Sequence, residues 1–260
     1  MKIGIIGMGH VGTTLHALLD THAQLVTYDA AHDDKYPHDE LAECDFAIVC
    51  VNTPPGPAGE CDLTHVRDAI TRLPTTKVMI KSTVAPGTTD ALIADTGKQI
   101  CFSPEYVGQS TYINPLCDDA ATMPFLVLGG QPSIRRYFIE TLQPMLGPTK
   151  VYFQCGAAEA EVIKYMENTF FATKITFVNE FWQICRAVGA DWHTVREGWL
   201  LDPRVESSHT AVFTTDRGFG GKCLPKDTAA IIAAARLAGY EPHLLAAVLA
   251  SNTRFRAPAA

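Results

Sequence analysis

Short apolar runs alternate with segments of helical periodicity over the first half of the chain. Each run ends at a turn residue, as buried strands do, and helical patterns at Thr13–Thr21 and Leu63–Leu73 lie between the runs. Strands that alternate with helices form parallel sheets with right-handed crossovers, so the pattern predicts an α/β fold. The predicted strands are Lys2–Ile6, Gln24–Asp29, Cys44–Val51, Lys77–Lys81, Ile100–Phe102 and Phe125–Leu128.

The pattern becomes mostly helical near Gly147–Gly156. Ala157–Val188 is a run of helix-forming residues without proline, which predicts one long helix. Two further helices are predicted at Asp227–Ala238 and His243–Phe255. We therefore expect a sheet domain over residues 1–150 and an all-α domain over residues 151–260, joined by the long helix.

The first strand leads into the loop Gly7-Met8-Gly9-His10-Val11-Gly12, a GxGxxG motif before a helix. Glycines there allow a tight turn and let backbone N–H groups approach a pyrophosphate at the helix N-terminus. Asp29 ends the second strand 17 residues after Gly12, where a carboxylate can accept hydrogen bonds from ribose hydroxyls. An ordinary βα turn with a surface aspartate is the alternative. The context predicts a Rossmann-type, doubly wound domain that binds NAD rather than NADP, because no arginine follows Asp29.

Two candidate catalytic groups lie in the helical half. Lys164 and Asn168 are spaced i, i+4 and project from one face of the long helix, although this spacing is also common for solvated residues. Cys223 lies in Gly218–Asp227, just after a glycine-rich turn and at a helix start, where the helix N-terminus and neighbouring lysines favour a thiolate. Asp227, one turn later, could hold or relay a proton. A buried, inert thiol is the alternative, and it suits the other seven cysteines better.

Two loops follow predicted strands, at Ser82–Thr88 and Ser103–Glu105. Ligand sites of open α/β sheets form at the carboxyl ends of the strands, so both loops are candidates, with ordinary turn chemistry as the alternative.

Composition narrows the class of protein. The net charge of −7 disfavours nucleic-acid binding, and no apolar stretch has the length of a membrane span. The N-terminus lacks the organisation of a signal peptide, so we expect a cytoplasmic protein. The eight cysteines show no metal-ligand spacing, and no metal is expected.

Together these residues resemble the UDP-glucose/GDP-mannose dehydrogenase family. The resemblance covers nearly the whole chain, and its most specific part is the glycine turn followed by Cys-x-x-Lys-Asp. The matching motifs, in family order, are Gly7–Gly12, Asp29, Val51–Pro54, Ser82–Thr88, Ser103–Glu105, Lys164 with Asn168, Asp202–Arg204 and Gly218–Asp227.

The resemblance implies oxidation of a primary alcohol to a carboxylate in two steps with two NAD. Cys223 would attack the intermediate aldehyde, and its thiohemiacetal would be oxidised to a thioester that water hydrolyses. Lys164 and Asn168 would stabilise the oxyanion, Asp227 and Thr83 would position water, and Glu105 would assist hydrolysis. Further implied contacts are those of Thr53 and Thr83 with the cofactor and those of Glu105, Lys164, Asn168, Arg204 and Gly220 with the substrate.

The sequence departs from the family pattern at three places. The chain ends at Ala260, so we expect the third, nucleotide-binding domain of the family to be absent. Gln109 replaces a second glutamate, and the segment from Arg204 to Gly218 is longer and less glycine-rich than usual. The expected substrate is a nucleotide sugar, and a different hydroxymethyl compound or a non-catalytic NAD-binding role remain alternatives.

Aromatic residues along the long helix predict an interface. The helix has more apolar surface than one small domain readily covers, and we expect a homodimer, with an intrachain core as the alternative. The residues concerned are Phe170, Phe171, Phe177, Phe181 and Trp182.

Overall fold

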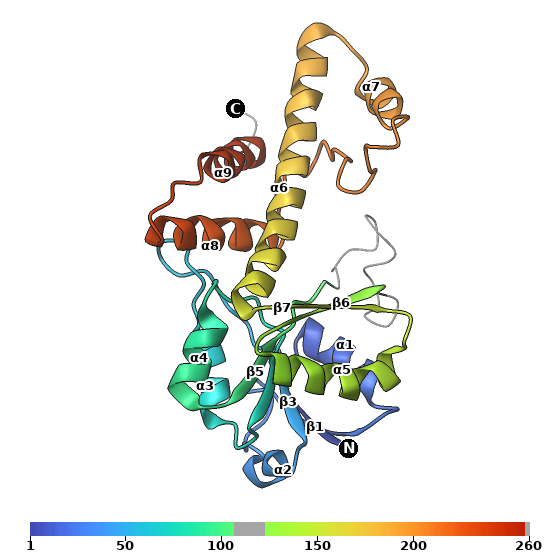
Figure 1. The fold of residues 1–260 in the computed structure, drawn as a ribbon. Helices are drawn as coiled ribbons and strands as arrows, with labels where there is room; N and C mark the ends of the chain where they lie inside the picture. The colour runs from blue at the N-terminus through green and yellow to red at the C-terminus, as the bar shows by residue number, and fades with distance from the viewer. Residues whose placement is uncertain (107–122, 258–260) are drawn as a thin grey trace. The chain divides into compact units, whose positions relative to one another are not determined.

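The computed structural model describes residues 1–106 and 123–257, and the chain divides into two compact units (Figure 1). Unit 1 comprises Met1–Gly56 and Cys61–Lys164, and unit 2 comprises Pro57–Glu60 and Tyr165–Ala260. Gln109 and Cys117 lie outside the described residues.

Unit 1 is built on a seven-stranded sheet of order β2-β1-β3-β4-β5-β6-β7. Neighbouring strands are parallel except β5 and β6, which are antiparallel. The prediction of an α/β fold with a doubly wound sheet is confirmed. The strands are β1 Lys2–Ile6, β2 Gln24–Tyr28, β3 Phe46–Val49, β4 Lys77–Ile80, β5 Gln99–Phe102, β6 Phe125–Gly129 and β7 Val151–Cys155.

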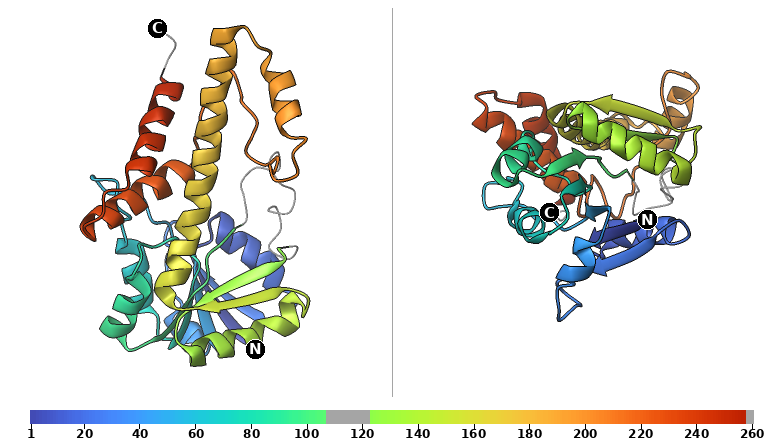
Figure 2. Two further views of the ribbon diagram at one scale, coloured as in Figure 1. Left: turned by 45° about the horizontal axis from the view of Figure 1, so that its top comes forward. Right: turned by 60° about the horizontal axis from the view of Figure 1, so that its bottom comes forward.

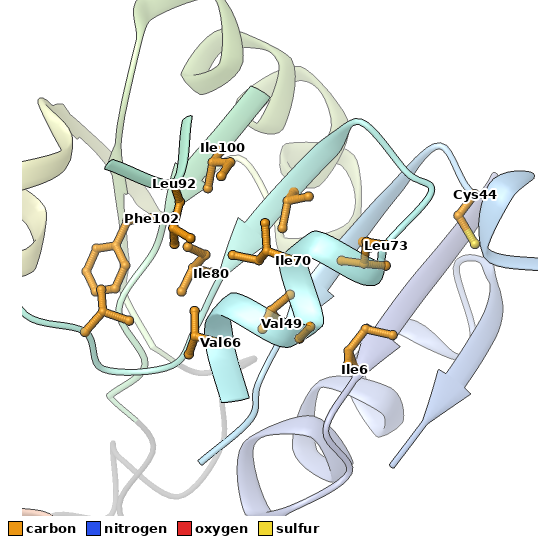
Figure 3. Packing of buried hydrophobic residues seen from close by; sticks show 14 of the residues in the cluster. Ile6, Cys44, Val49, Val66, Ile70, Leu73, Ile80, Leu92, Ile100 and Phe102 are labelled. Atoms are coloured by element: carbon orange, nitrogen blue, oxygen red, sulfur yellow. The ribbon is translucent and has the colours of Figure 1, made fainter. Parts of the chain in front are cut away.

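Helices cover both faces of this sheet, which explains why its central strands are apolar throughout (Figures 1 and 2). In β3, Phe46 and Ile48 pack on the face covered by α1 (His10–Leu19) and α5 (Pro132–Leu146). Ala47 and Val49 point to the opposite face, with α3 (Thr64–Arg72) and α4 (Thr88–Thr96). Figure 3 shows this second cluster, in which Val66 and Ile70 of α3 lie over the strands.

Four elements of unit 1, namely α2 (His38–Ala42), α4, α5 and β7, were not predicted as helix or strand. The short helix α2 has one buried residue, Leu41, too few for a periodic pattern. Helix α5 starts at a proline and contains Pro144, which normally argues against a helix. Strand β7, at the edge of the sheet, has exposed residues at both alternating positions, although its sequence is mostly apolar.

The long helix α6, Ala157–Val188, has the predicted bounds. It begins in unit 1 and continues into unit 2, where α7 (Trp192–Trp199), α8 (Leu224–Leu237) and α9 (His243–Arg256) follow. Small apolar clusters form the core of the described part of unit 2, including these two. One joins Ala172, Phe219 and Val248, and the other joins Val178, Cys185 and Trp192.

Candidate active site

The first strand is followed by a loop at which only glycine fits at two positions. Gly7 has φ +93°, and a Cβ there would lie 2.8 Å from the carbonyl carbon of Cys50. A Cβ on Gly12 would lie 2.0 Å from the carbonyl oxygen of Gly7. Gly9 differs, because a Cβ there would meet nothing within 4 Å. The backbone at Gly9 is therefore open to a ligand.

This loop forms one side of a cleft of about 380 Å³. Asp29 also lines the cleft, and its carboxylate accepts the N–H groups of Ala31 at 2.9 Å and Met8 at 2.7 Å. These two hydrogen bonds lower the pKa of Asp29, so the carboxyl group is ionised at neutral pH. An ionised acceptor and an open glycine backbone fit the ribose and pyrophosphate of a dinucleotide. Of the other predicted cofactor residues, His10, Val11 and Gly12 lie in the first turn of α1, outside the cleft lining.

Two further residues of this cleft were missed in the sequence. The guanidinium of Arg72 lies 4.4 Å from the ring centroid of Tyr36 and 5.9 Å from that of Tyr28. The hydroxyl of Tyr36 is buried and has no hydrogen-bond partner in the described part of the chain. These side chains give the cleft a partly charged, aromatic wall that suits an aromatic base. Arg72 and Tyr36 belong to no motif, and only the fold brings them to the cleft.

Side-chain hydrogen bonds connect the loop after β4 to the loop after the neighbouring strand β3. Thr53 is buried and donates its hydroxyl to the carbonyl oxygen of Thr83 at 2.8 Å. Ser82 donates its hydroxyl to the carbonyl oxygen of Val51 at 2.7 Å. Predicted residues Thr53 and Thr83 are therefore adjacent at the carboxyl edge of the sheet, but neither lines the cleft that holds Asp29.

Glu161, a buried acid in the second turn of α6, holds the other end of the same loop. It accepts hydrogen bonds from the N–H of Gly87 at 2.6 Å and from the N–H and hydroxyl of Thr89 at 2.8 and 2.6 Å. Its side chain is fully buried, and burial raises its pKa despite these donors. Sequence inspection missed Glu161 because a glutamate in a helix normally faces solvent.

Glu105 and Lys164, two predicted catalytic residues, both belong to unit 1. Glu105 is 3.4 Å from the ammonium of Lys81, and its other oxygen accepts the N–H of Tyr106 at 2.8 Å. The ammonium of Lys164 lies 4.9 Å from the ring centroid of Tyr106. Tyr106 thus contacts both predicted residues.

Unit 2 holds the predicted cysteine and its neighbours. Cys223 is exposed and is the N-cap residue of α8. Its carbonyl oxygen accepts the N–H of Asp227 at 2.8 Å. The buried carboxylate of Asp227 accepts the side-chain amide of Asn168 at 2.5 Å and the ammonium of Lys226 at 2.6 Å. Of the cysteines in the described ranges, Cys223 is the exposed one, which is the environment expected for a reactive thiol.

The glycine turn before Cys223 is held by α9. Asn252 accepts the N–H of Phe219 at 2.7 Å and donates its amide to the carbonyl oxygen of the same residue at 2.9 Å. A Cβ on Gly218 would lie 2.3 Å from the Asn252 oxygen, and one on Gly220 would lie 2.9 Å from the Arg256 guanidinium. Gly218 combines this close contact with φ +74°, whereas Gly220, predicted to contact substrate, has as its neighbour the end of a flexible side chain that can move. Asn252 was missed because nothing in the sequence links α9 to the turn.

Arg204, the remaining predicted substrate residue, is strongly exposed and paired with Asp202. Its guanidinium contacts both carboxylate oxygens, at 3.0 and 2.5 Å, within the turn that follows α7.

No group of three metal-ligating side chains is found in residues 1–106 and 123–257, and none of their helices is long and apolar enough to cross a membrane.

Comparisons with known proteins identify the family. The model of the NAD-binding domain of the UDP-glucose/GDP-mannose dehydrogenase family matches residues 33–142, and that of the central domain of the family matches residues 158–254. The chain belongs to this family. The match confirms NAD as the cofactor and an oxidoreductase acting on CH–OH groups as the class of enzyme.

Individual relatives agree with this assignment. The chain is 32% identical to the UDP-glucose 6-dehydrogenase AglM of Haloferax volcanii, over 97% of this chain and 69% of the relative. It is 33% identical to TuaD, a UDP-glucose 6-dehydrogenase of Bacillus subtilis, over 82% of this chain and 47% of the relative. The structure of a UDP-glucose dehydrogenase from Pyrobaculum islandicum has the same fold, with a TM-score of 0.82 and 24% identity over 97% of this chain and 68% of the other. The chain thus spans between about half and two thirds of the length of these relatives.

Proposed function

We propose that this protein oxidises the primary alcohol of a nucleotide sugar to a carboxylate, through a thioester on Cys223. The observation that carries the proposal is the exposed Cys223 at the start of α8, next to a buried Asp227 that is held by Asn168 and Lys226. The names of the relatives, UDP-glucose 6-dehydrogenases, support UDP-glucose as the first substrate to test.

The residues of unit 1 hold the cofactor in this proposal. Gly7, Gly9 and Asp29 bind the pyrophosphate and ribose, and Thr53 and Thr83 complete the cofactor site. NAD, when bound, supplies the electron acceptor for both oxidations.

The proposed covalent chemistry centres on Cys223. The thiolate of Cys223 attacks the aldehyde carbon, and loss of two electrons from the thiohemiacetal gives a thioester. Asn168 and Lys164, one turn apart on α6, stabilise the oxyanion, since amide and ammonium groups donate to developing negative charge. Asp227 and Thr83 position the water that attacks the thioester, and Glu105 assists its deprotonation. The thiol leaves as the acid is released.

The proposal includes a homodimer and a cytoplasmic location. Exposed apolar side chains follow one stripe of α6 in unit 2, at intervals of three, four and seven residues, which a second copy would cover. Arg204 would contact substrate in the site of the neighbouring subunit, and Gly220 would lie beside the substrate. The stripe consists of Met166, Phe170, Phe177, Phe181, Ile184 and Val188.

The test is NADH formation with a panel of substrates. UDP-glucose, GDP-mannose, other nucleotide sugars and free nucleosides are each supplied with NAD, and the acid product is identified by mass spectrometry. We expect two NADH for each molecule of acid from one nucleotide sugar. NAD binding without turnover of any nucleotide sugar would reject the proposed substrate class.

A further inference from the structure

Lys81 and Glu105 form a buried ion pair at the carboxyl edge of the sheet. Lys81 directly follows β4, and Glu105 lies three residues after the end of β5. Their charged atoms are 3.4 Å apart, and the side chains are 6% and 13% exposed. The other oxygen of Glu105 accepts the N–H of Tyr106 at 2.8 Å. The carboxylate is therefore held at both oxygens.

The surroundings of this pair are apolar. Lys81 and Glu105 line a small cavity of about 40 Å³, whose other walls include Leu15, Met79 and Phe125. Moving an ammonium group from water into such surroundings is strongly unfavourable unless a partner compensates its charge. The two buried charges compensate each other, and loss of Lys81 would leave the Glu105 carboxylate without this cation.

We propose that Lys81 is a positioning residue that keeps Glu105 ionised and fixes its orientation for the hydrolysis of the acyl-enzyme. This inference rests on the proposed function, in which Glu105 assists that hydrolysis. An ionised, oriented carboxylate can accept a proton from water, whereas a protonated one cannot.

Other charged and titratable groups lie near the pair. Lys150 lines the same cavity and donates to the carbonyl oxygen of Met123, and Lys164 lies over the ring of Tyr106. Burial raises the pKa of the Cys50 and Cys101 thiols to about 12, so both are neutral at working pH. Lys81 forms a defined ion pair with Glu105.

The titration of Glu105 tests this directly and needs no substrate. Carboxyl-¹³C glutamate is incorporated, Glu105→Gln assigns the resonance, and the titration midpoint is compared in the wild type, Lys81→Met and Lys81→Arg. We expect Lys81→Met to raise the midpoint by about 1–3 pH units, because a neighbouring cation favours the charged carboxylate. Lys81→Arg should keep it near the wild-type value. A midpoint that does not move in Lys81→Met would overturn the proposal.

Two controls separate positioning from folding. Lys98→Met removes a half-buried lysine that donates to the carbonyl oxygens of Leu73 and Thr75, and it should leave the Glu105 midpoint unchanged. Lys81→Gln gives the same readout if Lys81→Met does not fold.

Kinetics provide the second readout. In Lys81→Met the acid limb of the pH profile of kcat should move to higher pH, as the NMR midpoint does. A fall in kcat without a shift of this limb would contradict a positioning role. Full turnover by Cys223→Ser would reject the proposed function and leave the NMR result intact. An unchanged midpoint would reject the role of Lys81 and would not affect the proposal of a thioester on Cys223.

Discussion

The side-chain amide of Asn168 donates to the carboxylate of Asp227 at 2.5 Å, and both residues are buried. This hydrogen bond joins α6 to the first turn of α8, one turn after Cys223. Lys226 holds the other carboxylate oxygen at 2.6 Å. Asp227 is thus fixed on both sides, as a group that positions water has to be.

We therefore expect activity to depend on both the size and the charge of the side chain at position 168, which is Asn168 in the wild type. We expect Asn168→Ala to lower kcat about 100-fold, as the loss of one donor to an oxyanion does. Asn168→Asp should lower it further and move the acid limb of the pH profile upward, because two carboxylates at this distance share a proton. Steady-state kinetics across pH measures both effects. Equal activity and identical pH profiles for the two variants would contradict this role.

Asp29 should determine the choice of cofactor. Asp29→Asn removes a charged acceptor, so we expect the Kd for NAD to rise about tenfold and the preference over NADP to fall. The N–H groups of Ala31 and Met8 lower the pKa of Asp29, so the wild-type carboxyl is ionised at neutral pH and its titration should not change NAD affinity there.

Isothermal titration calorimetry measures the effect of Asp29. Asp34→Asn, an exposed change in the same loop, serves as control. An unchanged Kd in Asp29→Asn would argue against ribose recognition by this residue.

Arg72 should bind the adenine end of the cofactor. Its guanidinium lines the cleft above Tyr36. A cation–π contact between this guanidinium and the adenine would contribute about 1–2 kcal/mol to binding. Arg72→Ala should therefore raise the Kd for NAD about 5- to 30-fold. Nicotinamide mononucleotide lacks the adenine, and its Kd should not change. Arg67→Ala is the matched control, because Arg67 lies on the same helix but pairs with Asp95 outside the cleft. An equal rise in the Kd for NAD and for nicotinamide mononucleotide in Arg72→Ala would contradict a contact between Arg72 and the adenine.

The sequence predicted the elements whose pattern is local. β1 and α6 have the predicted bounds, because buried strands and long proline-free helices carry a strong pattern. Helix α1 starts three residues earlier than predicted, since the helix begins inside the glycine motif. β7, an edge strand with exposed residues, and α5, which contains Pro144, were missed.

The candidate site was predictable only where a motif marks it. Gly7, Asp29 and Cys223 could be chosen from spacing and composition. Arg72 and Glu161 could not, because each reaches its partners through the fold, from a helix whose sequence carries no signature. The roles of the motif residues stay predictions until kinetics test them.

Glu161 should contribute to stability through the loop it holds. Glu161→Ala leaves the N–H groups of Gly87 and Thr89 without their acceptor, and we expect the free energy of unfolding to fall by about 2–3 kcal/mol. Urea denaturation measures this loss. Glu180→Ala, at an exposed position of the same helix, should change stability by less than about 0.5 kcal/mol. Equal stability of the two variants would contradict the proposed contribution of Glu161 to stability.

Single-turnover stoichiometry of Cys223→Ser tests the central claim, a covalent role for this thiol. Enzyme is mixed with excess NAD and limiting nucleotide sugar, and NADH and acid are counted for each molecule of substrate. The wild type and Cys155→Ser, a change of a half-buried thiol, should give two NADH and one acid. Cys223→Ser should bind NAD normally, give at most one NADH and form no acid. Two NADH and one acid from Cys223→Ser at the wild-type rate would contradict the account.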